Sequence, residues 1–477
     1  MNAILESVAE TDRLTPVRSG ATLRLSEMVT ALSYALDLTE GQTPGHCLRS
    51  CWIGMHVGQR LGLGVEELSN LYYTLLLKDS GCSSNAARLW QLYGGDELRI
   101  KRDFKLVNSQ RVLELAGFVL HNAGPGEAPG SRMKRLLKLL RHGERLATEL
   151  IQTRCERGAD IVRRLGFDEC VSAAIFSLDE HWNGKGRPQG LRGEAIPLHA
   201  RISLLAQVLD VFTTADGRRA ACTEVRRRAG SWFDPQVCEA FFAVSSSEAL
   251  WSGLATEGLE RRVAALEPAA RNIFIDEDRV DSIAEAFADI IDAKSSYTYG
   301  HSQRVAHYAD AVALRMDLSP WRRRWLRRGA LLHDIGKLGV SNGILDKPGR
   351  LDAAEWEAVK KHARFTEEIL QRVRIFRALA PIAGAHHERL DGKGYPKGLA
   401  DEAIALETRI ITVADIFDAI TAARPYRGPI PIDQALSLME ADRGSAIDRE
   451  CLDALKSAAP WDAASTTTPA GPSERGG

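Results

Sequence analysis

The sequence has no long hydrophobic run and no recognisable export signal. No stretch of about 18 uninterrupted apolar residues occurs, so nothing predicts a helix that crosses a bilayer. The N-terminus, MNAILESVAETDRL, lacks the basic stretch and apolar core of a secretory signal. These absences together predict a cytoplasmic protein without a membrane span.

An excess of charge of one sign is also missing. The 62 Lys and Arg residues are balanced by 63 Asp and Glu residues, for a formal net charge of -1. Without a basic excess we expect no nucleic-acid polymer as a partner, and any anion has to be bound locally. Cysteine is scarce, with eight residues and no CxxC pair, which predicts free, buried thiols in a reducing compartment.

Length and hydrophobic spacing predict the fold class. A chain of 477 residues with 44% apolar residues is long enough for two to four domains at about 100–200 residues each. Apolar residues recur at spacings of three and four, and alternating, strand-like runs are scarce, so we expect an all-α protein. Residues 1–20 and 459–477 lack this pattern and are expected to be loose or disordered.

An internal repeat organises the chain. TPGHCLRSCW, from Thr43, aligns with TYGHSQRVAH, from Thr298, at an offset of 255 residues (298 minus 43). Further on, DEHWNGKGRPQGL, from Asp179, aligns with HERLDGKGYPKGL, from His387, at an offset of 208 (387 minus 179). The difference places about 47 extra residues in the first copy, at about 83–153. We therefore expect two tandem helical bundles, at 21–268 and 275–458.

The second copy is rich in side chains that bind metal ions. Imidazoles and carboxylates gather within one stretch of it, at His301, His333, Asp334, His362, His386, His387 and Asp415. Several of them share a helical stripe with apolar residues, so their side chains are expected to point inward. Buried carboxylates need a counter-charge, which a divalent metal ion provides.

The ligand types indicate the metal and the chemistry. A mixture of imidazole and carboxylate suits Fe, Mn or Zn, whereas Ca and Mg prefer oxygen ligands alone. Asp334, which directly follows His333, is the carboxylate best placed to bridge two ions. Two metals on one bridge are typical of phosphoryl ester hydrolysis.

LLHDIGKLGV and HHERLDGKGYP, with a His before, a His between and an Asp after, closely resemble the HD-GYP subgroup of HD-superfamily phosphohydrolases. The resemblance covers about residues 280–450. It implies HD-domain-like helical bundles and a centre of Fe or Mn ions that hydrolyses bacterial cyclic dinucleotides. The family's metal ligands correspond to all seven residues named above. Trinuclear members carry a Glu four residues before the first His, where this chain has Tyr297, so we expect two ions.

The resemblance also implies the substrate contacts. Asp334 and Lys337 correspond to catalytic positions, with Lys337 contacting the scissile phosphate. The loop with Gly394, Tyr395 and Pro396 borders the substrate. Two arginines of ARPYR are expected to bind the remaining phosphate, and these are Arg424 and Arg427.

The first copy has lost most of this set. In register it keeps His46 and Asp79, and the other positions hold Lys78, Arg154, Leu178, Asp179 and Gln207. Lys78 and Arg154 bring positive charge to places where metal ions belong. We interpret this copy as a degenerate HD-GYP-like domain that serves dimerisation, docking of a signalling protein or control of the second copy.

Three functions remain open from the sequence. The leading one is two-metal hydrolysis of cyclic di-GMP to pGpG or GMP by an activated water. A second is hydrolysis of cyclic GMP-AMP (3′3′-cGAMP), because the sequence does not choose between the bases. A third is a non-catalytic cyclic dinucleotide receptor or signalling scaffold.

Overall fold

The computed structural model describes residues 23–268, 274–295, 298, 300–422 and 428–458. Within these ranges the regular structure is helical except for one pair of two-residue strands, which confirms the all-α prediction. Both segments predicted to be loose, 1–20 and 459–477, lie outside the described residues. All eight cysteines are free thiols, and six of them are buried.

The N-terminal half begins with strand β1 (Leu23–Arg24). The helices that follow are α2 (Leu25–Thr39), α3 (His46–Arg60), α4 (Val65–Leu77), η2 (Cys82–Asn85), α5 (Ala86–Tyr93), α6 (Glu97–Phe104), α7 (Val112–Asn122), α8 (Pro129–Arg164), α9 (Glu169–Phe176), η3 (Gly193–Ala195), α10 (Leu198–Arg228), α11 (Pro235–Ser245), α12 (Glu248–Ser252) and α13 (Leu259–Ala264).

The C-terminal half begins with strand β2 (Phe274–Ile275). It continues with α14 (Glu277–Asp292), α15 (His301–Arg315), α16 (Pro320–Leu332), η5 (Ile335–Gly339), α17 (Asn342–Leu345), α18 (Ala353–Arg372), η6 (Arg374–Phe376), α19 (Ala380–Ala383), η7 (Asp401–Ala403), α20 (Leu406–Thr421), α21 (Ile432–Glu440) and α22 (Arg449–Ser457).

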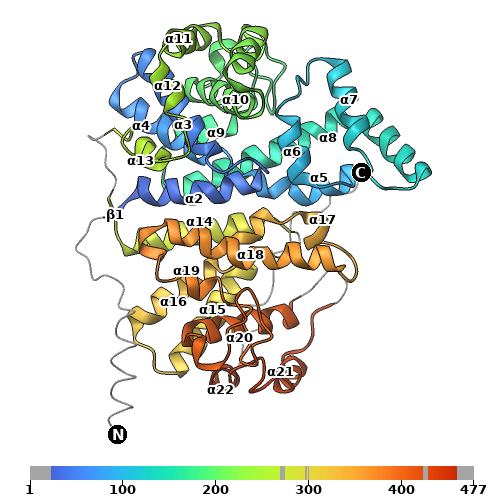
Figure 1. Ribbon diagram of the computed structural model, residues 1–477, viewed down its shortest axis with the longest axis vertical. Coiled ribbons are helices and arrows are strands. Elements are labelled where there is room, and N and C mark those ends of the chain that lie inside the picture. Colours follow the sequence, from blue (N-terminus) through green and yellow to red (C-terminus); the bar gives the residue numbers. More distant parts are fainter. Residues whose placement is uncertain (1–22, 269–273, 296–297, 299, 423–427, 459–477) are drawn as a thin grey trace.

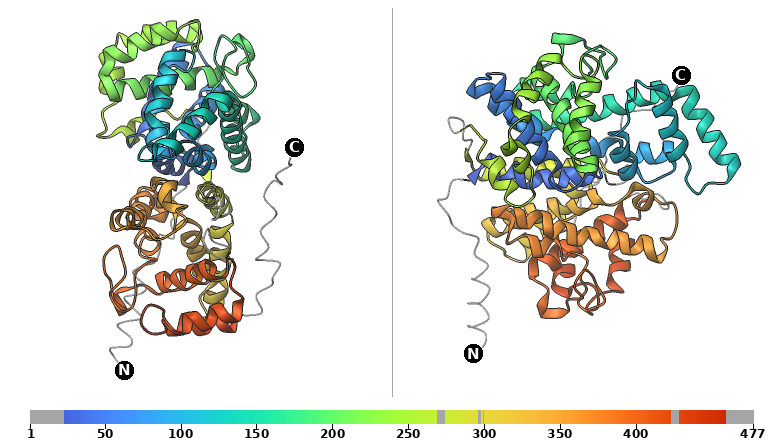
Figure 2. Two further views of the ribbon diagram at one scale, coloured as in Figure 1. Left: turned by 90° about the vertical axis from the view of Figure 1, so that its right-hand side faces the viewer. Right: turned by 45° about the horizontal axis from the view of Figure 1, so that its top comes forward.

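The two halves are stacked and share one core. In Figure 1 the first half lies above the second, with α2 running along α18 where they meet. Figure 2 shows the same division from two further sides. The short strands pair across the halves, with Leu23 opposite Ile275. A continuous cluster of buried apolar side chains includes members of both halves, so the bundles pack as one body.

The extra segment of the first copy forms a helical extension. Helices α5 to α8 project to one side of the molecule (Figure 1) and have a small core of their own, made by Leu92, Ala123, Leu139 and Leu146. The far end of α8 returns to the first half, where Ile161 and Val162 join the main core. The extension is thus anchored at its base and separate at its tip.

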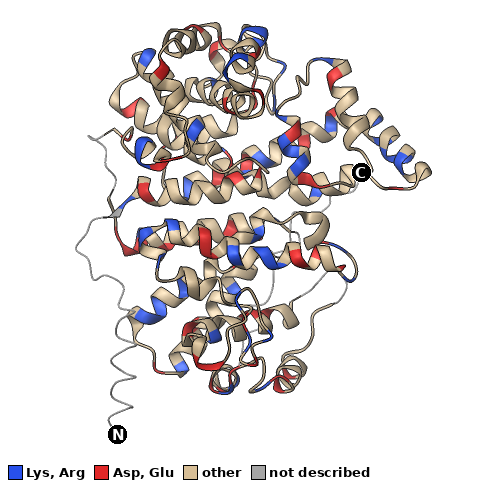
Figure 3. Cartoon of the chain, viewed as in Figure 1, with Lys and Arg blue, Asp and Glu red and all other residues tan. Residues whose placement is uncertain are grey.

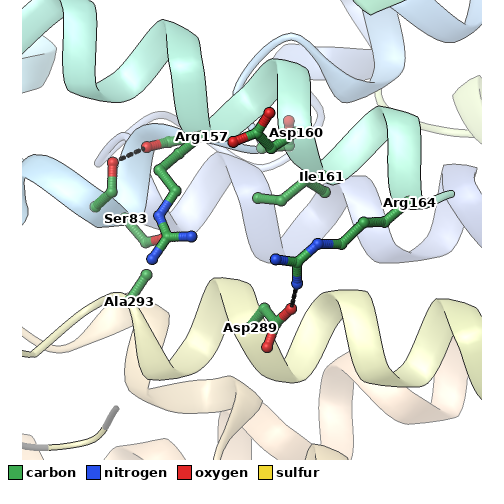
Figure 4. A pocket seen from close by; sticks show the side chains of 10 residues that line it. Ser83, Arg157, Asp160, Ile161, Arg164, Asp289 and Ala293 are labelled. Carbon is green, nitrogen blue, oxygen red and sulfur yellow. Dashed lines mark hydrogen bonds and ion pairs between the residues drawn. The ribbon is translucent and has the colours of Figure 1, made fainter. Parts of the chain in front are cut away.

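Polar contacts join the halves at several points. Arg372 of α18 pairs with Glu260 of α13 at 2.6 Å, and Arg279 of α14 donates to the carbonyl of Leu165, just after α8. In a small pocket between α8 and α14, Arg164 pairs with Asp289 (Figure 4). None of the seven candidate metal ligands lines that pocket.

The described residues include neither a membrane-spanning helix nor, in the view of Figure 3, a region of one charge sign. Among the described helices none is both long and apolar enough to cross a membrane. In the view of Figure 3, basic and acidic residues are interspersed along both halves.

Candidate metal centre

Five elements bring the candidate ligands together. His301 begins α15, directly after Gly300, whose φ of 67° is a left-handed conformation that glycine adopts readily. His333 directly follows the last residue of α16, a helix capped at its start by Ser319, and Asp334 comes next. The remaining side chains come from α18, from the residues after α19 and from α20, and they are His362, His386, His387 and Asp415.

The carboxylate of Asp334 lies in the middle of the cluster. Its Oδ2 is 3.4 Å from Nε2 of His301 and 3.3 Å from Nε2 of His333. Its Oδ1 is 3.6 Å from Nε2 of His362 and 3.7 Å from Nε2 of His386. Each oxygen therefore faces a different pair of imidazoles, which is the arrangement that a bridging carboxylate requires.

Two groups of ligand atoms flank this carboxylate. The first subsite comprises His301, His333 and Asp415, and the second comprises His362, His386 and His387; within each, the possible ligand atoms lie within 4.8 Å of one another. Asp415 Oδ1 is 3.4 Å from His301 Nε2. The cluster thus offers two candidate metal subsites, with Asp334 between them.

Backbone carbonyls orient three of the imidazoles. Nδ1 of His333, His362 and His386 lies 2.7, 2.6 and 2.6 Å from the carbonyl oxygen of the residue three positions earlier. A carbonyl only accepts, so Nδ1 carries the proton and the Nε2 lone pair points into the cluster. Such an outer hydrogen bond fixes the tautomer of a metal-binding histidine.

His301 is oriented differently, by a carboxylate. Its Nδ1 is 2.7 Å from Asp418 Oδ2, and Arg304 donates to both oxygens of Asp418, at 2.6 and 3.1 Å. Neither Asp418 nor Arg304 is among the residues singled out from the sequence. The repeat held the signal: Asp210 and Arg49 occupy the matching positions and make the same contacts to His46.

Charge and burial suit a bound cation. Burial lowers the pKa of His362 to about 4 and that of His386 to about 3, so both imidazoles are neutral. Burial opposes protonation of His301 too, yet Asp334 and Asp418 outweigh it and raise the pKa to about 10. The first subsite thus stabilises positive charge.

Several buried atoms in the cluster have no hydrogen-bond partner. They are Nε2 of His301, Nε2 of His333 and Oδ1 of Asp334. Unsatisfied polar atoms are costly in a protein interior. All three atoms face the cluster and can serve as ligand atoms for a metal ion, so the residues present fit a divalent metal centre.

The glycine-rich loop beside the cluster is held by Glu388. Its carboxylate accepts hydrogen bonds from the backbone amides of Lys397 at 2.7 Å and Leu399 at 2.9 Å. Gly394 lies so close to the chain that a Cβ there would be 2.5 Å from Cα of Glu388. Tyr395 is thereby placed with its ring 4.7 Å from that of His387.

Only some of the residues predicted to contact the substrate lie at the ligand cluster. Tyr395 and the partly exposed Lys337 lie at the cluster, and the ammonium of Lys337 pairs with Asp334. Gly394 shapes the loop, and Pro396 is exposed. Arg424 and Arg427 fall outside the described residues.

The N-terminal half has ammonium groups where the C-terminal half has its ligand cluster. Lys78 pairs with Oδ2 of Asp79, and Nζ of Lys105 is 3.8 Å from Oδ1 of the same carboxylate. Lys105 also pairs with Glu40 at 2.8 Å, and Arg154 pairs with Asp179. Lys105 comes from the extra segment, so the repeat alignment does not reveal it.

Comparison with known proteins agrees with this geometry. A family model described as HD domain matches residues 99–237 and 285–451. The chain is 52% identical over 437 residues to "3'3'-cGAMP-specific phosphodiesterase 3" of Vibrio cholerae, covering 92% of this chain and 95% of that protein. It is 40% identical over 181 residues to "Cyclic di-GMP phosphodiesterase response regulator RpfG" of Xanthomonas campestris, covering 38% of this chain and 48% of that protein.

A solved structure is similar over nearly the whole length. The crystal structure of a cyclic GMP-AMP specific phosphodiesterase of V. cholerae, V-cGAP3, matches with a TM-score of 0.64 and 48% identity. The match covers 92% of this chain and 98% of that one.

Fold and site define a metal-dependent phosphohydrolase with an all-α architecture. The chain belongs to the HD-domain family and, by its HHERLDGKGYP loop, to the HD-GYP subgroup. The resemblance found in the sequence is confirmed.

Proposed function

We propose that the protein is a phosphodiesterase that hydrolyses a bacterial cyclic dinucleotide, with 3′3′-cGAMP as its substrate. The observation that carries the proposal is the position of Asp334, whose two oxygens face two separate groups of imidazoles. In two-metal phosphodiesterases, a carboxylate bridges the two cations that activate the attacking water.

The metal ions are proposed to be two Fe or two Mn. The first would be held by His301, His333 and Asp415, the second by His362, His386 and His387, and both by Asp334. Neutral imidazoles mixed with carboxylates match the preference of these ions. When bound, such a pair polarises the phosphoryl group and activates a water.

The chain's own residues complete the site. Lys337 places an ammonium group beside Asp334 with part of its side chain open to solvent, so it is suited to offset charge on the phosphate. Tyr395 and the loop around Gly394 form a wall next to His387. Contacts of Arg424 and Arg427 with the second phosphate remain a prediction.

The choice of substrate follows from the relatives. The sequence alone ranks cyclic di-GMP first, but the relative matched over 92% of the chain acts, by its name, on 3′3′-cGAMP. Two relatives named for cyclic di-GMP match 38% and 42% of the chain. We therefore place 3′3′-cGAMP first and keep cyclic di-GMP as the second candidate.

A side-by-side turnover assay tests the substrate. The full chain, purified without oxygen and loaded with Mn or Fe, is given 3′3′-cGAMP, cyclic di-GMP and cyclic di-AMP, and the products are identified. Faster loss of 3′3′-cGAMP supports the proposal, and faster loss of cyclic di-GMP contradicts the substrate assignment. Product analysis also shows whether hydrolysis stops at the linear dinucleotide.

A double variant separates an enzyme from a receptor or scaffold. His333→Ala with Asp334→Ala removes ligands of both subsites. If turnover matters to the cell, hydrolysis and the cellular response fall together. A response that persists without hydrolysis favours a non-catalytic role.

We also propose that residues 21–268 form a degenerate HD-GYP-like domain and that 275–458 form the catalytic one. The ammonium groups of Lys78 and Lys105 lie on opposite oxygens of Asp79, much as two cations are proposed to lie on Asp334. Positive side chains there exclude metal ions by repulsion. A role of this domain in homodimerisation or in binding a signalling protein, and a cytoplasmic location, remain predictions.

A further inference from the structure

Trp356 lies beside the candidate centre with 46% of its surface exposed. Single exposed apolar residues are ordinary in soluble proteins, so the exposure alone carries no argument. The position of this residue is what matters. It lies near the start of α18, the helix that also carries His362.

The start of α18 is held firmly. Asp352 and Glu355 form a capping box, and the amide of Trp356 donates to the carbonyl of Asp352 at 2.9 Å. Lys347 extends the arrangement through an ion pair with Glu355 at 2.5 Å. The indole is therefore presented from a fixed backbone.

A line of rings leads from the ligand cluster to this indole. The ring of His387 is 4.7 Å from Tyr395, and the ring of Tyr395 is 5.8 Å from Trp356. Tyr395 also lies 6.3 Å from the ring of His362. His387 and Tyr395 are both partly exposed, and Trp356 at the end of the line is 46% exposed.

The orientation of the rings leaves stacking surface free. Trp356 and Tyr395 are at 80° to each other, so neither ring lies flat on the other. A flat aromatic group entering beside Tyr395 can lie on the open indole without displacing a stacked neighbour. Aromatic side chains bind nucleobases in this way, because every base has a π-face.

We propose that Trp356 is a substrate-binding residue that stacks on a nucleobase of the cyclic dinucleotide while its phosphate lies at the metal ions. This inference rests on the proposed function. A phosphate held by the cluster places its own sugar and base next to the loop wall, where Tyr395 and Trp356 lie. Stacking does not read base edges, so Trp356 adds affinity for both purines and does not choose between them.

The test compares KM and kcat of wild type and Trp356→Ala on 3′3′-cGAMP and cyclic di-GMP. We expect KM to rise about 5- to 150-fold for both, which corresponds to about 1–3 kcal/mol for one lost stack. The kcat should change by less than about threefold, since the indole does not touch the reacting phosphorus. Trp356→Phe, which keeps a π-face, should recover most of the affinity.

Two controls separate stacking from damage to the site. Methyl p-nitrophenyl phosphate carries no nucleobase, so Trp356→Ala should hydrolyse it like wild type. Trp321→Ala removes an indole of matched exposure, 50%, from α16 and should leave every constant unchanged.

The outcomes distinguish this inference from the proposed function. If wild type hydrolyses no cyclic dinucleotide, the proposed function fails and the inference fails with it. If wild type hydrolyses them but Trp356→Ala leaves KM unchanged, only the stacking inference is overturned. Loss of methyl p-nitrophenyl phosphate turnover in Trp356→Ala overturns it as well, because the residue would then be structural.

Discussion

Glu97 of α6 and Lys294, just after α14, form a buried ion pair between the two halves, with Nζ 2.9 Å from Oε1. Both residues are almost fully buried, at 0% and 1% exposure. The same carboxylate accepts hydrogen bonds from Ser341 at 2.8 Å and from the amide of Asn342 at 2.9 Å. One side chain of the N-terminal half thus anchors two segments that flank the candidate centre.

Replacing this carboxylate should destabilise the protein strongly. Glu97→Gln keeps the shape but leaves the ammonium of Lys294 buried without a counter-charge, which costs about 3–5 kcal/mol in the free energy of unfolding. Chemical denaturation followed by circular dichroism measures the loss. Glu169→Gln, which breaks a surface pair with Arg163, is the matched control and should have no measurable effect. Equal stability of Glu97→Gln and wild type would show that the pair does not join the halves.

Asp418, the carboxylate that orients His301, should affect metal binding and turnover, whereas the matching Asp210 of the N-terminal half should not. Asp418→Asn weakens the hydrogen bond that orients the imidazole, and we expect metal affinity or activity to fall about 10- to 100-fold. Asp210→Asn removes the equivalent carboxylate behind His46 and should leave metal content and turnover unchanged. Metal titration and steady-state kinetics on both variants check this. Equal effects of the two substitutions would contradict a single metal centre.

The glycine-rich loop should not tolerate a side chain at Gly394. A Cβ there would lie 2.5 Å from the amide nitrogen of Arg389, so the backbone has to move and Tyr395 moves with it. For Gly394→Ala we expect kcat/KM for cyclic dinucleotides to fall more than about tenfold, a loss of about 1.4 kcal/mol or more. Gly349→Ala is the control, because nothing lies within 4 Å of its Cβ. Full activity of Gly394→Ala would mean that the loop is not a wall of the site.

A buried histidine of the N-terminal half should make stability depend on pH. Burial, with Arg228 and Arg187 nearby, lowers the pKa of His181 from its ordinary 6.5 to about 3. The amide of Gln110 is 3.0 Å from its Nδ1, and the ring of Trp232 stacks on the imidazole at 4.0 Å. Between these pH values the unfolded chain binds the proton and the folded chain does not. Stability is therefore lost as pH falls below about 6.5, by up to about 1.4 kcal/mol per pH unit.

The comparison that isolates this effect uses His181→Gln, which does not titrate. Unfolding free energies of wild type and variant are measured from pH 7 to pH 4, and the difference between them is plotted. Wild type should lose stability relative to the variant as pH falls. A difference that stays constant with pH would show that His181 is not held neutral.

The fold class and the members of the cluster can be predicted from the sequence for a physical reason. Helical spacing is a local property, and the HD and GYP strings carry the ligand types in order. The structure brings the other six candidate residues around Asp334. Their role as ligands stays a proposal, and so does that of Lys337.

Contacts between segments that are distant in the chain could not be predicted from the sequence. Glu97 and Lys294 are far apart in the chain, and no local pattern pairs them. Lys105 reaches Asp79 from the extra segment, which has no counterpart in the second copy. The role of Asp418 could not be predicted, because an acidic residue one turn after Asp415 is expected on the solvent-exposed side of a helix. The matching Asp210 could have revealed it, since it is kept where the ligands are lost.

Counting metal ions per chain tests the central claim most directly. The full-length protein, purified anaerobically with Mn or Fe, is analysed by mass spectrometry of its metals, beside His333→Ala/Asp334→Ala and His46→Ala/Asp79→Ala variants. We expect two ions in wild type, close to none in the first variant and two in the second. Ions retained in the first variant, or lost from a folded second variant, would contradict a single two-metal centre in the C-terminal half.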